Sequence, residues 1–251
     1  MVNNQQTDKI IEKIKQEIIK KTNPISIFLY GSYNTPDYLP GVSDLEFGVI
    51  KEDKVSISKI LRNIADIYST TDMRFRLYSY ELEKLKNMTF DSPFTKSVFI
   101  RHLILTSKTT WGKQIVENLP LPPITLLDAY REATFSTMRA LSGIFFLRTN
   151  NIEESNEMGY KACLFATLSL EYILGEFPIG FKNIVNTSKK LGLDKESNRL
   201  IEFAYKLRQE KIKPSKEELY EFVFNTISYC NQVVEKKIKK ELEKGNRILI
   251  Q

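Results

Sequence analysis

Apolar residues follow two different spacings in the first half of the chain, and each spacing predicts a different kind of element. Isoleucines at helical spacing predict an amphipathic helix over residues 7–21. A continuous apolar run over residues 25–30 predicts a buried strand that ends at Gly31-Ser32, and residues 44–50 predict a second strand after a loop rich in proline. The other elements predicted before residue 118 are a helix over 55–68, a strand over 73–80, helices over 81–88 and 94–105, and a strand over 108–112.

A proline-rich segment, Leu119-Pro120-Leu121-Pro122-Pro123, separates this part of the chain from the rest, because proline does not continue a helix or a central strand. Every later segment has helical character. The predicted helices cover 125–149, 154–175, 181–191, 195–210 and 215–244. We therefore predict an α/β (α+β) domain with a small mixed sheet over residues 1–118, followed by an all-α helical bundle over residues 119–251.

The composition, 42% hydrophobic and 27% charged, is that of a soluble globular protein. The first residues carry charges where a signal peptide needs an apolar core, and no apolar run reaches the length of a membrane span, so we expect a cytoplasmic protein without membrane contact. The net charge of +6 suits a polyanionic partner, but much of the lysine alternates with glutamate on helices that read as solvated. Nucleic-acid binding therefore stays open without specific support.

The chain has one histidine, His102, and two cysteines, Cys163 and Cys230, in apolar helical segments. Buried free thiols are the expected state of such cysteines. A multi-histidine metal site is excluded, so a bound metal would need carboxylate ligands, which suit Mg²⁺ or Mn²⁺.

The candidate chemistry lies at the ends of the first two predicted strands. Asp44 and Glu46 are two residues apart on one strand, so their carboxylates point to the same face and could share divalent ions. Gly31-Ser32, at the end of the preceding strand, allows close approach of the backbone to a phosphate and supplies N–H and hydroxyl donors. Nucleotidyl transfer needs this combination, because metals neutralise the phosphate oxygens and activate the attacking hydroxyl.

The order of these parts resembles the signature of the nucleotidyltransferase superfamily, which has the DNA-polymerase-beta-like fold. An apolar strand ends in Gly31-Ser32, eleven residues follow, and an acid–apolar–acid sequence, Asp44 to Glu46, opens the next strand. Ser43-Asp44-Leu45-Glu46 resembles the kanamycin, or aminoglycoside, nucleotidyltransferase branch, and Thr110-Trp111-Gly112-Lys113 resembles a turn that many members carry. A helical second domain is also similar to that branch.

The resemblance implies transfer of a nucleoside monophosphate from a nucleoside triphosphate to a hydroxyl, by a two-metal mechanism with Mg²⁺ or Mn²⁺. Asp44 and Glu46 would be the catalytic metal ligands, and Gly31 and Ser32 would bind the nucleotide. The expected partners are a nucleotide and a small-molecule acceptor of the aminoglycoside type. A homodimer is an open alternative to a monomer.

The predicted strand over 73–80 departs from the superfamily pattern, because members usually carry a third acid there and this chain has Arg74 and Arg76. Phe75 and Leu77 are expected to face the core, so both arginines should share the face of the two carboxylates. An arginine there would either replace the metal as a partner of a carboxylate or bind a triphosphate, and the sequence leaves both roles open.

Two further departures concern the loop after Ser32 and the general base. Relatives usually follow Gly-Ser with a small residue, arginine and glycine, whereas Tyr33-Asn34-Thr35-Pro36 stands here. Kanamycin-type enzymes place a general-base glutamate on the first helix of the second domain, where Thr134-Phe135-Ser136-Thr137 has none and Glu132 lies one turn away. A second function class follows, chiefly from Arg74 and Arg76 in place of a third acid: a catalytically degenerate homologue that acts as a nucleotide sensor or interaction module.

Overall fold

The computed structural model describes residues 4–40, 43–52, 74–90 and 95–251, and the helix predicted over 55–68 lies outside them. The chain divides into two compact units, Met1–Leu121 and Pro122–Gln251. The division falls inside the proline-rich segment. None of the helices in the described part of the chain is both long enough and apolar enough to cross a membrane.

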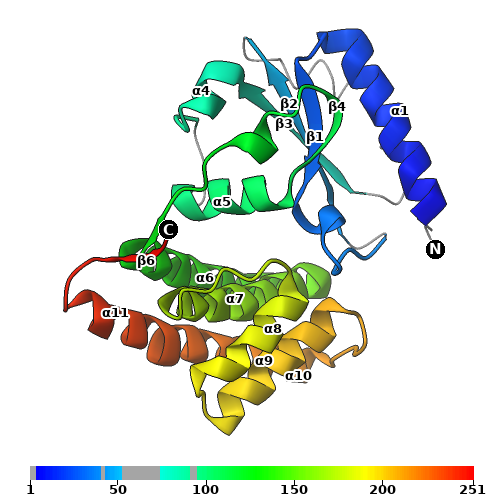
Figure 1. Ribbon diagram of the computed structural model, residues 1–251. Helices are drawn as coiled ribbons and strands as arrows, with labels where there is room; N and C mark the ends of the chain where they lie inside the picture. The colour runs from blue at the N-terminus through cyan, green and yellow to red at the C-terminus, as the bar shows by residue number, and fades with distance from the viewer. Residues whose placement is uncertain (1–3, 41–42, 53–73, 91–94) are drawn as a thin grey trace. The chain divides into compact units, whose positions relative to one another are not determined.

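The first unit is built on a four-stranded mixed sheet in the order β3-β2-β1-β4 (Figure 1). β1 pairs antiparallel with both β2 and β4, whereas β2 and β3 are parallel. The strands are β1 Ser26–Tyr30, β2 Leu45–Lys51, β3 Phe75–Glu81 and β4 Lys108–Gly112, and the helices are α1 Asn4–Thr22, α4 Leu82–Lys86 and α5 Lys96–Thr106. All of these elements were predicted, with ends that differ by a few residues.

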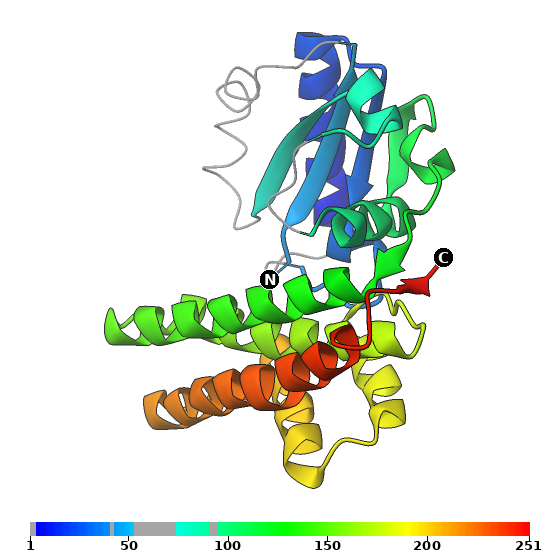
Figure 2. The same ribbon diagram turned by 90° about the vertical axis from the view of Figure 1, so that its left-hand side faces the viewer.

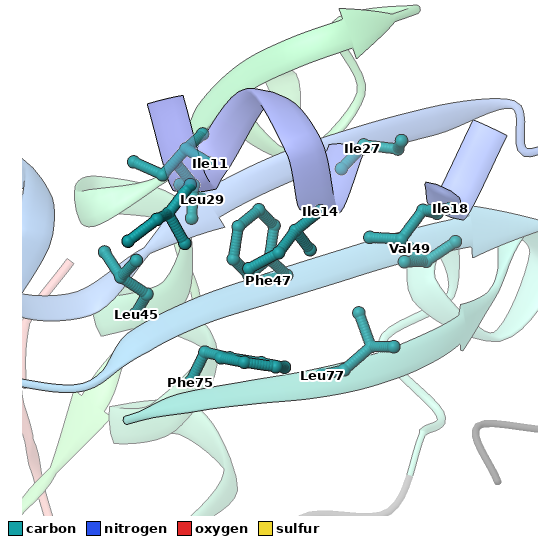
Figure 3. Packing of buried hydrophobic residues seen from close by; sticks show 11 residues of the cluster. Ile11, Ile14, Ile18, Ile27, Leu29, Leu45, Phe47, Val49, Phe75 and Leu77 are labelled. Atoms are coloured by element: carbon teal, nitrogen blue, oxygen red, sulfur yellow. The ribbon is translucent and has the colours of Figure 1, made fainter. Parts of the chain in front are cut away.

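One face of the sheet packs against α1, as the close-up of the core shows (Figure 3). The isoleucines of α1 at helical spacing meet the alternate residues of β1, β2 and β3 that point to this face. The fully buried members include Ile14, Ile18, Leu45, Phe47 and Val49. The single tryptophan of the chain, Trp111, packs against the same cluster and therefore reports on the folding of this unit.

The other face carries a second core at one end of the sheet. Phe28 and Ile50 pack there with apolar residues of α4, α5 and the segment that follows β4. The strands are thus covered on both faces at this end. At the opposite end of β2 and β3 the second face carries polar side chains, and this end holds the residues singled out from the sequence.

The second unit is a helical bundle, and four of its helices begin at polar residues whose side chains cap them. Its elements are α6 Leu126–Arg148, α7 Ile152–Ile173, α8 Phe181–Ser188, α9 Lys195–Arg208, α10 Lys216–Ser228, a π-helical segment Tyr229–Glu235 and α11 Lys236–Leu242. Thr125 and Ser215 form capping boxes with Asp128 and Glu218, which satisfies backbone N–H groups at the starts of α6 and α10. Figure 2 shows α6 (green) alongside the continuous helical stretch from α10 to α11 (orange to red).

A two-stranded sheet within the second unit joins its two ends. β5 (Ile124–Thr125) pairs antiparallel with β6 (Ile248–Ile250). The sequence pattern does not predict this sheet, because strands of two and three residues are too short to establish a period.

The packing of α1 predicts an asymmetric response to two neighbouring substitutions. Ile14→Ala should lower the free energy of unfolding of the first unit by about 2–5 kcal/mol, because it leaves a cavity at a fully buried site. Lys13→Ala, at an exposed position of the same helix, should change it by less than about 0.5 kcal/mol. Urea unfolding followed by Trp111 fluorescence measures both, and equal effects would mean that α1 does not dock on the sheet.

Glu171 of α7 gives a second prediction. It is fully buried, and no described donor bonds either carboxylate oxygen. Burial, with a contribution from Glu176, raises its pKa to about 9 from an ordinary value of 4.5, so the folded protein holds the neutral acid at pH 7. The unfolded chain ionises near pH 4.5, so stability is full below that pH and falls as the pH rises toward 9.

Glu171→Gln should therefore raise the free energy of unfolding of the helical unit by about 1–3 kcal/mol at pH 8 and have little effect at pH 4. Circular dichroism at 222 nm during urea unfolding at the two pH values measures this difference. Glu153→Gln, at an exposed position of the same helix, is the matched control. A gain of the same size at pH 4 would show that ionisation is not its cause.

Candidate functional site

The candidate site begins at Gly31, where β1 ends and a 3₁₀ turn, Gly31–Asn34, starts. Gly31 has a φ of +76°, a left-handed conformation that favours glycine. A Cβ atom at this position would lie 2.2 Å from the Oε2 atom of Glu46. The absence of a side chain therefore lets the backbone of the turn lie directly against the Glu46 carboxylate.

The turn is fixed to the end of α5 by side-chain hydrogen bonds. The Gly31 N–H donates to Thr106 Oγ1 at 2.9 Å, and the Asn34 side-chain amide donates to the carbonyls of Leu29 at 2.9 Å and Thr106 at 2.7 Å. The Thr106 hydroxyl in turn donates to the carbonyl of His102 at 2.8 Å. The Gly31 N–H, expected from the sequence to face a phosphate, is thus engaged with Thr106 in the free protein, while Ser32 carries the hydroxyl of the turn.

Asp44 and Glu46 lie at the start of β2. Asp44 immediately precedes the strand and Glu46 is its second residue, opposite Tyr30 of β1. Leu45 and Phe47 are buried against α1, so the two acids lie on the other face of the sheet. The side chain of Asp44 is 18% exposed, so it is partly buried and still in contact with solvent.

The arginines meet Asp44 as the alternation along β3 predicts. Arg76 Nε lies 2.9 Å from Asp44 Oδ2, and Arg74 Nε lies 3.7 Å from Asp44 Oδ1. Arg76 is also the register partner of Glu46 on the neighbouring parallel strand. Within the described ranges no group of three or more His, Cys, Asp or Glu side chains is arranged to hold a metal ion, so the described donors at this site are the two carboxylates.

Three tyrosines continue the same face of the sheet. Tyr78 hydrogen-bonds Arg76, and its ring centre lies 6.0 Å from that of Tyr30. Burial raises the pKa of Tyr30 and of Tyr80, so both remain neutral phenols, and they share a hydrogen bond. Partial burial alone would lower the pKa of Arg76, but the bond to Tyr78 and the charges of Asp44 and Glu46 outweigh it and raise that pKa.

Sequence reasoning overlooked these tyrosines and also Thr106 and Asn34. The signal for Tyr78 and Tyr80 was present, because they lie two and four residues after Arg76 and so share its face of the strand. Thr106 gives no such signal, because it is 75 residues from Gly31 in the chain. Glu132, noted as a neighbour of the expected general-base position, lies buried in α6, where its charge acts on Arg139.

The mixed sheet and the helical second unit have the fold that the motifs led us to expect. A solved structure with this fold is the spectinomycin adenyltransferase AAD(9) from Enterococcus faecialis, determined with ATP and spectinomycin. It is 16% identical to this chain, with a TM-score of 0.57 over 92% of this chain and 98% of the other. At that identity the likeness is one of fold.

A nucleotidyltransferase-like protein from Exiguobacterium sibiricum is more distant, at 11% identity and a TM-score of 0.34 over 95% of this chain and 80% of its own. No model of a known family matches the sequence, and no curated protein matches it.

The contact between Gly31 and Glu46 predicts that Gly31→Ala is more harmful than an equivalent change elsewhere. The added methyl group would meet Glu46 and would also sit at a left-handed backbone position, which costs about 1–2 kcal/mol for an L-residue. Gly192→Ala is the matched control, since Gly192 has a φ of +59° and no atom lies within 4 Å of the place that a methyl group would take there.

Thermal and urea unfolding should therefore show a loss in Gly31→Ala that exceeds the loss in Gly192→Ala by less than about 1 kcal/mol, because the atom in the way is the flexible carboxylate end of Glu46, which is displaced from its place near Arg76. Equal losses in both variants would mean that the Glu46 carboxylate moves aside without cost.

Proposed function

We propose that this chain transfers a nucleoside monophosphate from a nucleoside triphosphate to a hydroxyl group of a small-molecule acceptor. The observation that carries the proposal is the placement of the Gly31–Asn34 turn against Glu46, with Asp44 beside it, at one end of the sheet. The fold shared with an adenyltransferase solved with ATP and spectinomycin supports it.

The donor set fits a hard divalent cation. Asp44 and Glu46 supply carboxylate oxygens on one face, and Mg²⁺ is commonly bound by one or two carboxylates together with substrate phosphates. In the proposed two-metal mechanism, Asp44 and Glu46 would hold Mg²⁺ or Mn²⁺, which would supply neutralisation of phosphate charge and activation of the acceptor hydroxyl.

The other residues of the site bind and orient the nucleotide. Ser32 offers a hydroxyl at the turn, and Arg74 and Arg76 offer guanidinium groups, which match the geometry of phosphate oxygens. Asn34 and Thr106 hold the turn in place, and Tyr78 orients Arg76. These groups position the triphosphate so that its α-phosphorus lies in line with an incoming hydroxyl.

A catalytically degenerate nucleotide sensor or interaction module is the second candidate, and one observation favours it. Both oxygens of Asp44 face arginines, at a strand where superfamily members usually carry a third acid. The two candidates differ in turnover: the enzyme releases pyrophosphate when a nucleotide and an acceptor are both present, whereas the sensor binds nucleotide without release. Spectinomycin is the first acceptor to test.

The proposed role of Asp44 predicts that Asp44→Asn abolishes the Mn²⁺-dependent part of nucleotide binding. The melting temperature should change little, because partly exposed ion pairs contribute only about 0–1 kcal/mol. Glu52→Gln, which removes an exposed acid just past the other end of β2, should leave binding unchanged.

Isothermal titration of each of the four common nucleoside triphosphates, with Mn²⁺ and with EDTA, measures the difference. Equal Mn²⁺-dependent binding by wild type and Asp44→Asn would rule out Asp44 as a metal ligand. Absence of binding by the wild type to all four nucleotides would refute the proposed function.

A further inference from the structure

The negative charge of the Asp44 carboxylate is balanced by the positive charges of two nearby arginines. Each of its carboxylate oxygens faces the Nε atom of a different arginine, Arg76 at 2.9 Å and Arg74 at 3.7 Å. The side chain of Asp44 is 18% exposed, whereas the side chains of Arg74 and Arg76 are 41% and 56% exposed. The acid is therefore the more buried partner, while the arginines have more access to solvent.

The backbone maintains this arrangement. The Leu45 N–H donates to the Arg74 carbonyl at 2.9 Å, which fixes the residue after Asp44 beside Arg74. The parallel register then continues with Glu46 opposite Arg76. Tyr78, two residues farther along β3, holds Arg76 by a hydrogen bond. The meeting of both arginines with Asp44 thus follows from strand pairing.

A free divalent cation would meet two obstacles at this carboxylate. It would have to displace the guanidinium groups from the oxygens that it needs, and it would experience their positive charge at close range. A triphosphate has the opposite effect, since its oxygens attract the same guanidinium groups and can draw them from Asp44. Because both arginine side chains are exposed to solvent, phosphate oxygens can reach their guanidinium groups without a steric clash.

We propose that Arg74 and Arg76 are exchangeable counter-ions of Asp44, which keep it closed to a free divalent cation until the phosphates of a nucleotide take over both guanidinium groups. This inference rests on the proposed function for the identity of the incoming anion. Under this proposal the binding of metal and the binding of nucleotide depend on each other. The nucleotide frees Asp44 to bind the metal, and by thermodynamic reciprocity the metal strengthens nucleotide binding by the same factor.

The first test uses Mn²⁺ alone and needs no nucleotide. Mn²⁺ binding is followed by electron paramagnetic resonance. The variant Arg76→Gln and the double variant Arg74→Gln/Arg76→Gln should each bind Mn²⁺ at least about tenfold more tightly than wild type, because a repulsive charge and a competitor for Asp44 are gone. Lys84→Gln is the matched control: Lys84 pairs with Glu81 at 3.0 Å, beyond the far end of β3. It should leave Mn²⁺ affinity unchanged.

The second test uses α,β-methylene-ATP in EDTA. Asp44→Asn should bind this metal-free nucleotide several-fold more tightly than wild type, because the arginines no longer have Asp44 as an ion-pair partner. Arg76→Gln should bind it about tenfold more weakly than wild type, because a charged hydrogen bond to phosphate contributes more than a neutral one. Glu52→Gln should match wild type.

An unchanged Mn²⁺ affinity in both arginine variants would overturn the proposal that the arginines close Asp44 to metal, regardless of the nucleotide titrations. So would metal-free nucleotide binding in Asp44→Asn that is no tighter than in wild type. Failure of the proposed function looks different: wild type would bind no nucleotide even with Mn²⁺, while the Mn²⁺ titrations of the arginine variants would still report whether the arginines close Asp44.

Discussion

The position of β2 between an antiparallel and a parallel neighbour is the constraint on which the site depends. Its register places Tyr30 of β1, Glu46 of β2 and Arg76 of β3 in one row across the sheet. Side chains alternate between faces along a strand, so a shift of one residue would exchange this polar row for the apolar set that α1 covers. Burial of Phe47 and its neighbours against α1 therefore fixes the register, and the register in turn builds the site.

The same sheet explains why the chemistry lies at one end of it. Toward the other end, Phe28, Ile50 and Tyr80 are buried under α4 and α5, so polar groups there would lose contact with water. Near Glu46 this apolar packing gives way to the Gly31–Asn34 turn, which Thr106 and Asn34 hold in place. A charged row can lie there because each charge has an opposite charge or a hydrogen-bonding group beside it.

Much of this arrangement follows from local sequence. Alternation along two strands correctly predicts that Arg74 and Arg76 face Asp44, because the period of a strand is a property of the backbone. The bond between Gly31 and Thr106 joins residues 75 positions apart, and it depends on where α5 ends in space. The pairing of β5 with β6 likewise depends on how the bundle brings its ends together, and two or three apolar residues do not encode that.

The charge balance of the candidate site links its two arginines to the chemistry proposed for it. A site with three acids is strongly negative and attracts divalent ions before substrate arrives. Here Asp44 and Glu46 are offset by Arg74 and Arg76, which gives a formal charge of zero for the four side chains. A nucleoside triphosphate carries more negative charge than one divalent ion neutralises, so the complex of the two remains an anion. A neutral site whose arginines are more exposed than its Asp44 carboxylate would suit that complex under the proposed function, because the arginines would receive its phosphates while the released carboxylate would receive its metal.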